Sequence, residues 1–306
     1  MSRPVKRAYH ILDVFTDTPL AGNPLAVVHD SEGLDDTRMQ AIAREFNLSE
    51  TVFVMPPDNP AHSAKVRIFT PTIELPFAGH PTVGTAIILA RLRWGDAGMG
   101  EGAEQDGLVV LEEKVGPVRV GVVLKNGVAF AEFDIPQKPS ALDGEIDTDL
   151  AAAALGLVPA EIGFENHKAC RYTAGVDYDF VPVRDLAVLR RISVDTRTFD
   201  KAFVSRSCFV YTRETISTES AFHARMFAPS DGIAEDPATG SAVAAFAGVV
   251  RQFDQPLGGI HNYRIEQGHI MGRPSHVNLE IDVQGGLHAV RIGGAAVIVA
   301  EGTIDV

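Results

Sequence analysis

Cysteine and positive charge are both scarce in this chain of 306 residues. The two cysteines, Cys170 and Cys208, form no CxxC pair, and two thiols are too few for a disulfide framework or a structural zinc site. The 27 lysines and arginines stand against 40 acidic residues. A net charge of −13 argues against nucleic acid as the main partner, because phosphate binding needs a basic face.

Long apolar runs are also missing. The richest run, residues 242–250, has nine residues, whereas a membrane span needs about 18. The ten histidines form no H-E-x-x-H or H-x-H motif, so no metal site is expected. These absences predict a cytoplasmic protein with neither a membrane nor a nucleic-acid partner. The 45% of hydrophobic residues is typical of a folded globular protein with a large core.

The length and the residue patterns predict two domains. Pro136 and Pro139, followed by a polar stretch, indicate a connection between a first domain, residues 1–135, and a second domain, residues 136–306. A last strand near residues 295–306 is expected to return to the first domain. Alternating apolar and polar residues predict strands in the first half at residues 8–15, 25–29, 51–55, 108–112, 118–124 and 129–135.

The clearest pattern in the sequence is an internal repeat. Residues 67–71 (RIFTP) resemble residues 225–229 (RMFAP), and residues 80–86 (HPTVGTA) resemble residues 236–242 (DPATGSA). Both copies fit R-x-F-x-P, a short loop, and then x-P-x-x-G-[ST]-A. Agreement at six positions in the same order indicates a duplicated domain.

Each copy of the repeat leads into a predicted helix without a polar face. Residues 83–92 and 240–250 carry small or apolar side chains almost all around the helix, so each helix must be enclosed by protein. The surrounding sequence is mostly strands. The predicted fold is therefore α+β, with two pseudo-symmetric domains that each curl a mixed or antiparallel sheet around one central helix.

The N-termini of these two predicted helices suggest an anion-binding site. A helix N-terminus exposes unpaired N–H groups and attracts negative charge. Gly79 lies shortly before the first predicted start, Gly240 and Ser241 lie at the second, and His80 and Asp236 occupy matching places before each proline. If both ends face one cleft between the domains, a small carboxylate substrate fits. The alternative is that these glycines and hydroxyls only cap their helices.

Five ordered motifs resemble the phenazine-biosynthesis PhzF family. They are residues 21–27 (AGNPLAV), 45–51 (EFNLSET), 77–84 (FAGHPTVG), 235–242 (EDPATGSA) and 267–275, which contains QG and GRPS. The resemblance runs from about residue 8 to the C-terminus. It implies the diaminopimelate epimerase-like fold, which has two similar domains, and so agrees with the architecture expected from the repeat. It also implies a homodimer.

The resemblance further implies an isomerase that needs no cofactor and moves a proton on a small carboxylic acid. The family's best-known substrate is trans-2,3-dihydro-3-hydroxyanthranilate. Matching the motifs makes Glu45 the acid/base residue, gives His80, Asp236 and Ser241 substrate-positioning roles, and makes Asn23 a weaker candidate for lining the cleft. Related two-cysteine racemases carry thiols at the two helix starts, where this sequence has none.

Glu45 lies in the last turn of a helix predicted over residues 36–46, with Asp35 or Asp36 as N-cap. Burial there would raise its proton affinity, so that it could take and return a proton. Without the family resemblance, Glu50 and Glu74 are equally good candidates. Two alternatives to the isomerase also remain: a thiol-independent amino-acid epimerase or racemase, and a non-catalytic protein that binds small carboxylates.

Overall fold

The computed structural model describes residues 5–95, 97, 98 and 100–306. The chain divides into two compact units, one formed by Met1–Asp134 with Gly293–Val306 and the other by Ile135–Ile292. The chain therefore crosses from unit 1 to unit 2 once and returns with its last strand. Among the described helices, none has both the length and the apolar character that a membrane crossing requires.

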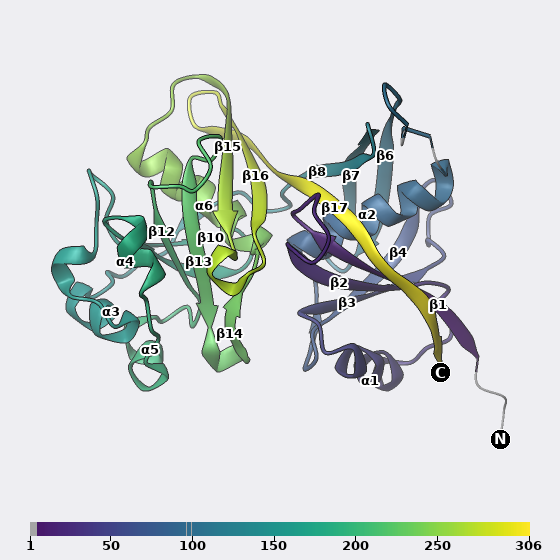
Figure 1. Ribbon diagram of the computed structural model, residues 1–306, viewed down its shortest axis with the longest axis horizontal. Helices are drawn as coiled ribbons and strands as arrows, with labels where there is room; N and C mark the ends of the chain where they lie inside the picture. Colours follow the sequence, from purple (N-terminus) through teal and green to yellow (C-terminus); the bar gives the residue numbers. More distant parts are fainter. Residues whose placement is uncertain (1–4, 96, 99) are drawn as a thin grey trace. The chain divides into compact units, whose positions relative to one another are not determined.

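Unit 1 is a closed barrel of mixed strands (Figure 1). Its elements are β1 (Lys6–Val14), β2 (Asn23–Val28), α1 (Asp36–Phe46), β3 (Glu50–Met55), β4 (Ala64–Phe69), β5 (Glu74–Leu75), α2 (Gly79–Trp94), β6 (Glu104–Glu113), β7 (Gly116–Lys125) and β8 (Val128–Asp134). The order around the barrel is β1, β2, β3, β4, β6, β7, β8, with parallel pairs at β2–β3 and β4–β6. The long β17 (Leu287–Asp305) pairs with both β8 and β1 and so closes the ring.

Helix α2 fills the barrel. It packs against β1, β2, β3, β6, β7 and β8, which is the enclosure that its all-round apolar sequence predicts. Gly84 is required where the helix passes β1 and β2, because a Cβ there would lie 2.6 Å from the Leu25 side chain and 2.8 Å from Val14. The helix begins at Gly79, four residues before the predicted start. Pro81 therefore lies in the first turn, where a missing N–H costs no hydrogen bond.

Unit 2 wraps a mixed sheet around its own central helix. Its elements are β9 (Ser140–Ala141), α3 (Thr148–Leu155), η1 (Pro159–Glu161), β10 (Cys170–Thr173), β11 (Asp177–Pro182), α4 (Leu186–Arg190), α5 (Thr196–Ala202), β12 (Cys208–Thr212), β13 (Phe222–Ala228), η2 (Pro229–Asp231), β14 (Ile233–Asp236), α6 (Gly240–Phe253), β15 (Gly259–Gln267), η3 (His269–Met271) and β16 (Ser275–Val283). The strands pair in the order β9, β10, β11, β12, β13, β15, β16, with parallel pairs at β11–β12 and β13–β15.

Phe246 on α6 is the centre of the unit 2 core. The side chain is fully buried, and its ring lies 4.7 Å from the Tyr211 ring and 4.9 Å from the Phe222 ring, both edge-on. Helix α6 begins at Gly240, so Pro237 precedes the helix, whereas Pro81 lies within the first turn of α2. The two central helices therefore begin at different positions of the repeated motif.

Replacing Phe246 with alanine tests the role of α6 as the core of unit 2. The truncation leaves a cavity among aromatic rings, so we expect the Phe246→Ala variant to lose about 3–5 kcal/mol of unfolding free energy. Urea denaturation followed by circular dichroism measures this loss. Leu257→Ala is the matched control because Leu257 is 83% exposed in the same unit. A loss at Phe246 no larger than at Leu257 would contradict the assignment.

Candidate functional site

An arginine–glutamate fork precedes each central helix. In unit 1, Arg67 Nε and Nη2 donate to the two carboxylate oxygens of Glu74 at 2.7 and 2.6 Å. In unit 2, Arg225 donates through the same two nitrogens to Glu235, both at 2.8 Å. Each glutamate lies five residues before the first residue of its helix, Gly79 or Gly240. The repeated sequence therefore makes the same contacts in both units. Each ion pair joins the two strands that precede the helix, β4 and β5 in unit 1 and β13 and β14 in unit 2.

The fork also decides the role of Glu74. Hydrogen bonds from Arg67 lower the pKa of this carboxyl, and Lys114 adds an ion pair at 2.6 Å. An ionised carboxylate that is held by two cations is a poor proton acceptor. Glu74, which the sequence left as a candidate base, is therefore a structural residue.

His80 is a buried, neutral imidazole in the first turn of α2. Burial lowers the pKa of His80 to about 3, so the ring carries no charge at neutral pH. Its Nε2 lies 3.3 Å from a carboxylate oxygen of Glu50, the first residue of β3. With the proton on Nε2, His80 can donate to that carboxylate after a small rotation of either side chain. The pair brings a carboxyl group to the start of α2.

Glu113 forms a second buried carboxyl site at the same helix start. The Thr82 hydroxyl oxygen lies 2.8 Å from the carbonyl oxygen of Ala78, the N-cap residue, and 2.7 Å from Glu113 Oε1. A hydroxyl has one proton and cannot donate to both. A protonated Glu113 that donates to Thr82 resolves the conflict. Burial independently raises the pKa of Glu113 to about 8, so the carboxyl is neutral at pH 7.

Sequence analysis missed Glu113, although a signal was present. Along β6 the side chains alternate, and Glu113 lies on the same face as the buried residues Val109 and Leu111. An acidic residue at an inward position of an alternating strand indicates a buried carboxyl. The neighbouring Glu112 points outward and caps the 58–59 turn instead.

In unit 2, Asp236 is the last residue of β14 and is buried. Its carboxylate accepts a hydrogen bond from Thr239 Oγ1 at 2.5 Å. Gln267, at the end of β15, donates to the Asp236 carbonyl oxygen at 2.7 Å and accepts from the Thr239 amide at 3.1 Å. Gln267 was noticed in the sequence only as part of a motif. It is a positioning residue that holds the turn before α6.

Ser241 lies in the first turn of α6 and is half-buried. Its hydroxyl is 2.7 Å from the hydroxyl of Tyr178 on β11. Within the described structure, the N-cap residues of α2 and α6, Ala78 and Thr239, make no side-chain capping bond. Both helix starts therefore keep first-turn N–H groups that no capping side chain satisfies, which is the feature that favours a bound carboxylate.

The remaining predicted site residues have mixed outcomes. Gly79 and Gly240 are the first residues of α2 and α6, and Asn23 is fully buried at the start of β2. Glu45 lies in the last turn of α1, as predicted, but its side chain is exposed on unit 1. The burial expected for Glu45 is therefore wrong, because α1 turns only its Met39, Ile42 and Ala43 face toward the unit 1 core.

The expectation of sequence-equivalent helix starts is also wrong. The motif aligns Gly84 with Gly240, yet α2 begins at Gly79, more than one turn earlier. As a result His80 is part of a helix, whereas Asp236 belongs to a strand. Thr85, the counterpart of Ser241 in the motif, is fully buried in the middle of α2.

The cysteines take no part in either helix start. Both thiols are free, and burial raises the pKa of Cys170 to about 12 and that of Cys208 well above its usual range. A thiol that stays protonated is a poor nucleophile and a poor base. Neither cysteine is therefore a candidate for the proton-transfer chemistry.

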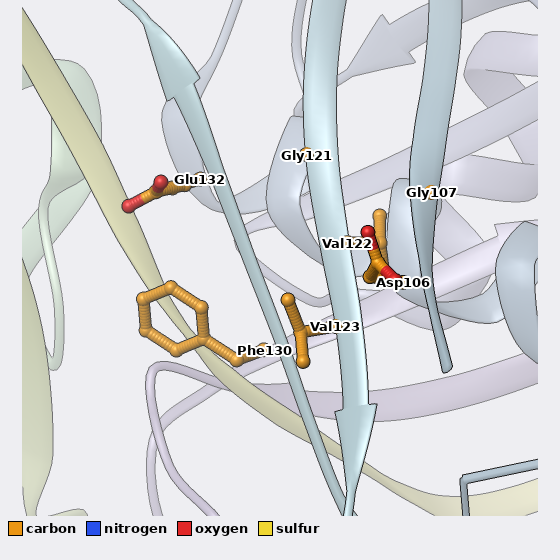
Figure 2. Close-up of a pocket in the computed structure, with 7 residues that line it drawn as sticks. All are labelled: Asp106, Gly107, Gly121, Val122, Val123, Phe130 and Glu132. Carbon is orange, nitrogen blue, oxygen red and sulfur yellow. The ribbon is translucent and has the colours of Figure 1, made fainter. Parts of the chain in front are cut away.

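A hollow of about 190 Å³ lies on the β6–β7–β8 face of unit 1 (Figure 2). It is a poorer candidate for carboxylate binding than the starts of α2 and α6. Gly121, which has no side chain, lies opposite Glu132 on β8 and beside the cross-strand pair Val123 and Phe130. Its charged groups are the carboxylates of Asp106 and Glu132. Two negative charges oppose the binding of a carboxylate, and none of the predicted site residues lines this hollow.

Comparison with known proteins identifies the family. The family model described as phenazine biosynthesis-like protein matches residues 12–302. The chain belongs to the PhzF family. An uncharacterized isomerase of Mesorhizobium japonicum is 54% identical, over 97% of this chain and 98% of that protein. The trans-2,3-dihydro-3-hydroxyanthranilate isomerase of Pseudomonas aeruginosa is 34% identical, over 96% and 98%.

A solved structure has the same PhzF architecture. The Bacillus anthracis phenazine biosynthesis protein of the PhzF family has a TM-score of 0.87 and 25% identity, over 99% of this chain and 100% of that chain. Because the relatives are named isomerases and the match covers nearly the whole chain, this PhzF protein is an isomerase.

The neutral state of Glu113 gives a pH-dependent prediction. The folded state holds a proton on Glu113 up to about pH 8, whereas the unfolded chain releases it near 4.5. The contribution of Glu113 to the free energy of unfolding is therefore fully present below pH 4.5. It declines by about 1.4 kcal/mol per pH unit as the pH rises toward 8. Glutamine resembles the neutral acid and does not titrate. We expect Glu113→Gln to gain stability relative to the parent protein between pH 5 and pH 8.

Urea denaturation at pH 5, 6, 7 and 8 measures this difference. Glu101→Gln is the matched control, because Glu101 is an exposed glutamate of the same unit. A Glu113→Gln difference that is independent of pH would show that the carboxyl is already ionised in the folded protein.

Proposed function

We propose that this protein is a cofactor-independent isomerase that moves a proton on a small, unsaturated carboxylic acid resembling trans-2,3-dihydro-3-hydroxyanthranilate. Glu45 takes and returns the proton. Asp236 and His80 hold the substrate's polar groups next to the reacting carbon. Ser241 and the amides near Gly79 and Gly240 bind its carboxylate.

The observation that carries this proposal is the family match over residues 12–302 together with relatives named for that reaction. Local geometry supports it. Asp236 is held by Thr239 and Gln267 in one fixed orientation, and a fixed group loses little entropy when a substrate binds. The uncapped first turns of α2 and α6 add two places that favour negative charge.

The neutral state of His80 suits a reaction that builds negative charge. Removing a proton next to an unsaturated system spreads negative charge over the substrate. A neutral imidazole does not bind the ground-state carboxylate too tightly. Its single N–H can donate to that charge only when the substrate replaces the Glu50 contact. The uncharged Glu113 keeps a second negative charge away from the same helix start.

Two carboxyl groups remain as candidates for the base. Glu45 is supported by the family motif, and its exposed position leaves its carboxylate accessible to a substrate. Glu50 is supported by its contact with His80 at 3.3 Å. We assign proton transfer to Glu45, because Glu50 is placed to orient the His80 ring. This division of roles has separate consequences for the two variants.

Exchange of substrate protons with solvent deuterium tests the assignment directly. We expect Glu45→Gln to lower deuterium incorporation into the bound acid by about 10²–10⁴-fold, the usual contribution of a general base, while the binding affinity stays within a few-fold. Glu50→Gln should change exchange less, because His80 keeps its place in the helix. Mass spectrometry of the recovered acid and calorimetric titration measure the two quantities.

Glu32→Gln is the control, since Glu32 is an exposed glutamate of the same unit. Full exchange in Glu45→Gln with loss in Glu50→Gln would move the base to Glu50. Binding without exchange in the unmodified protein would contradict isomerase chemistry and leave a carboxylate-binding protein.

A further inference from the structure

A group of histidines and one glutamate lies at the end of the β15–β16 hairpin in unit 2. Glu266 of β15 is paired across the hairpin with His276 of β16, and across the parallel β13–β15 pair with His223. These three residues therefore occupy one level of three adjacent strands. The 268–274 turn that joins β15 to β16 adds His269 to the same place.

The groups are close enough to share an ion. One ligand atom each from Glu266, His269 and His276 lies within 4.8 Å of the others. Ligands at about 2.1 Å from a tetrahedral zinc ion are roughly 3.4 Å apart, so small rotations of the half-buried His269 and His276 side chains would complete the geometry. Two imidazoles and one carboxylate are a donor set that binds late first-row divalent metals.

The carboxylate is already fixed in place. Its oxygens accept hydrogen bonds from His223 Nδ1 and the Ile216 amide, both at 2.9 Å, and from the Ser217 amide at 2.7 Å. A fully buried carboxylate that is held beside imidazoles is a pre-positioned ligand for a cation. The bond from His223 Nδ1 is the kind of outer-shell contact that orients the ligands of metal sites.

Two imidazole nitrogens of the group are buried without a hydrogen bond. Among the described residues, neither His223 Nε2 nor His269 Nε2 has a hydrogen-bond partner. Their rings lie 5.1 Å apart, and His223 is 1% exposed. A buried polar atom that makes no bond costs free energy, and a bound metal ion would relieve that cost at His269.

We propose that Glu266, His269 and His276 form a binding site for a divalent transition metal, with zinc as the expected ion. The site is structural. Side chains alternate along β15, so Glu266 faces the metal site while the next residue, Gln267, faces Asp236 on the other side of the strand. Because its ligands follow no local metal motif, the site cannot be recognised from the sequence.

Metal binding at this place would stiffen a turn that supports Asp236. A Cβ on Gly268 would lie 2.6 Å from the carbonyl oxygen of Pro237, so the turn touches the Asp236–Pro237 backbone directly. An ion that joins His269 in the turn to Glu266 and His276 in the flanking strands would restrain the Gly268 side of that contact. The metal therefore acts on the position of Asp236 and not on the substrate.

The metal alone is the probe. Untagged full-length protein is stripped with a chelator and dialysed against Zn²⁺, and we expect one ion per chain. Co²⁺ should give the visible absorption bands of a low-symmetry site with nitrogen and oxygen ligands. His269→Ala and His276→Ala should each weaken binding by at least about 10²-fold, more than the 10–100-fold typical of an outer-shell contact. His288→Ala, an exposed histidine of the same unit, should bind like the parent protein.

Circular dichroism and metal-free melting show whether each variant is folded. His269 lies in a half-buried turn, so His269→Ala keeps the test valid even if His276→Ala fails to fold. The proposal is overturned if the stripped protein takes up no stoichiometric Zn²⁺, or if folded His269→Ala binds Zn²⁺ as tightly as His288→Ala. Neither outcome depends on the substrate or on the isomerase proposal.

Discussion

Each unit of this protein depends on burying a helix that is apolar on every side. A helix of this kind cannot lie on a surface, because one of its faces would always expose apolar area to water. Strands must therefore surround it, and in unit 1 they close into a complete ring around α2. Once the sides are covered, the polar groups of the first turn are what the helix can still offer to a ligand. The candidate chemistry of the PhzF fold therefore gathers at the helix starts.

The entry into each helix is controlled by charged contacts. The Arg67–Glu74 and Arg225–Glu235 ion pairs each join the two strands that precede a central helix. Each arginine also lies over the ring of the phenylalanine two residues later, with Cζ 5.1 Å from the Phe69 centroid and 4.8 Å from the Phe227 centroid. A two-pronged ion pair fixes orientation as well as distance. This explains why the R-x-F-x-P pattern recurs in the sequence. The pattern sets the direction in which the chain enters the central helix.

Sequence reasoning was reliable where one local rule decides the outcome. Asp35 caps α1 over Asp36–Phe46 as the pattern predicts, and the alternating runs of the first half are strands β1, β2, β3, β6, β7 and β8. Predictions from the sequence were wrong where contacts with distant segments of the chain determine the structure. The start of α2 depends on Glu113 and Thr82, and the exposure of Glu45 depends on which face of α1 meets the core. No local pattern contains those contacts.

Strand β15 illustrates why such sites escape a motif search. Glu266 and Gln267 are adjacent in sequence but point to opposite faces, so one strand end supports two unrelated polar networks. Gln267 orders the turn that carries Asp236, and Glu266 gathers histidines from β13, β16 and the turn between β15 and β16. The first network lies within the family motifs, which contain both Asp236 and Gln267. The second network becomes visible only when strand register places His223, Glu266 and His276 side by side.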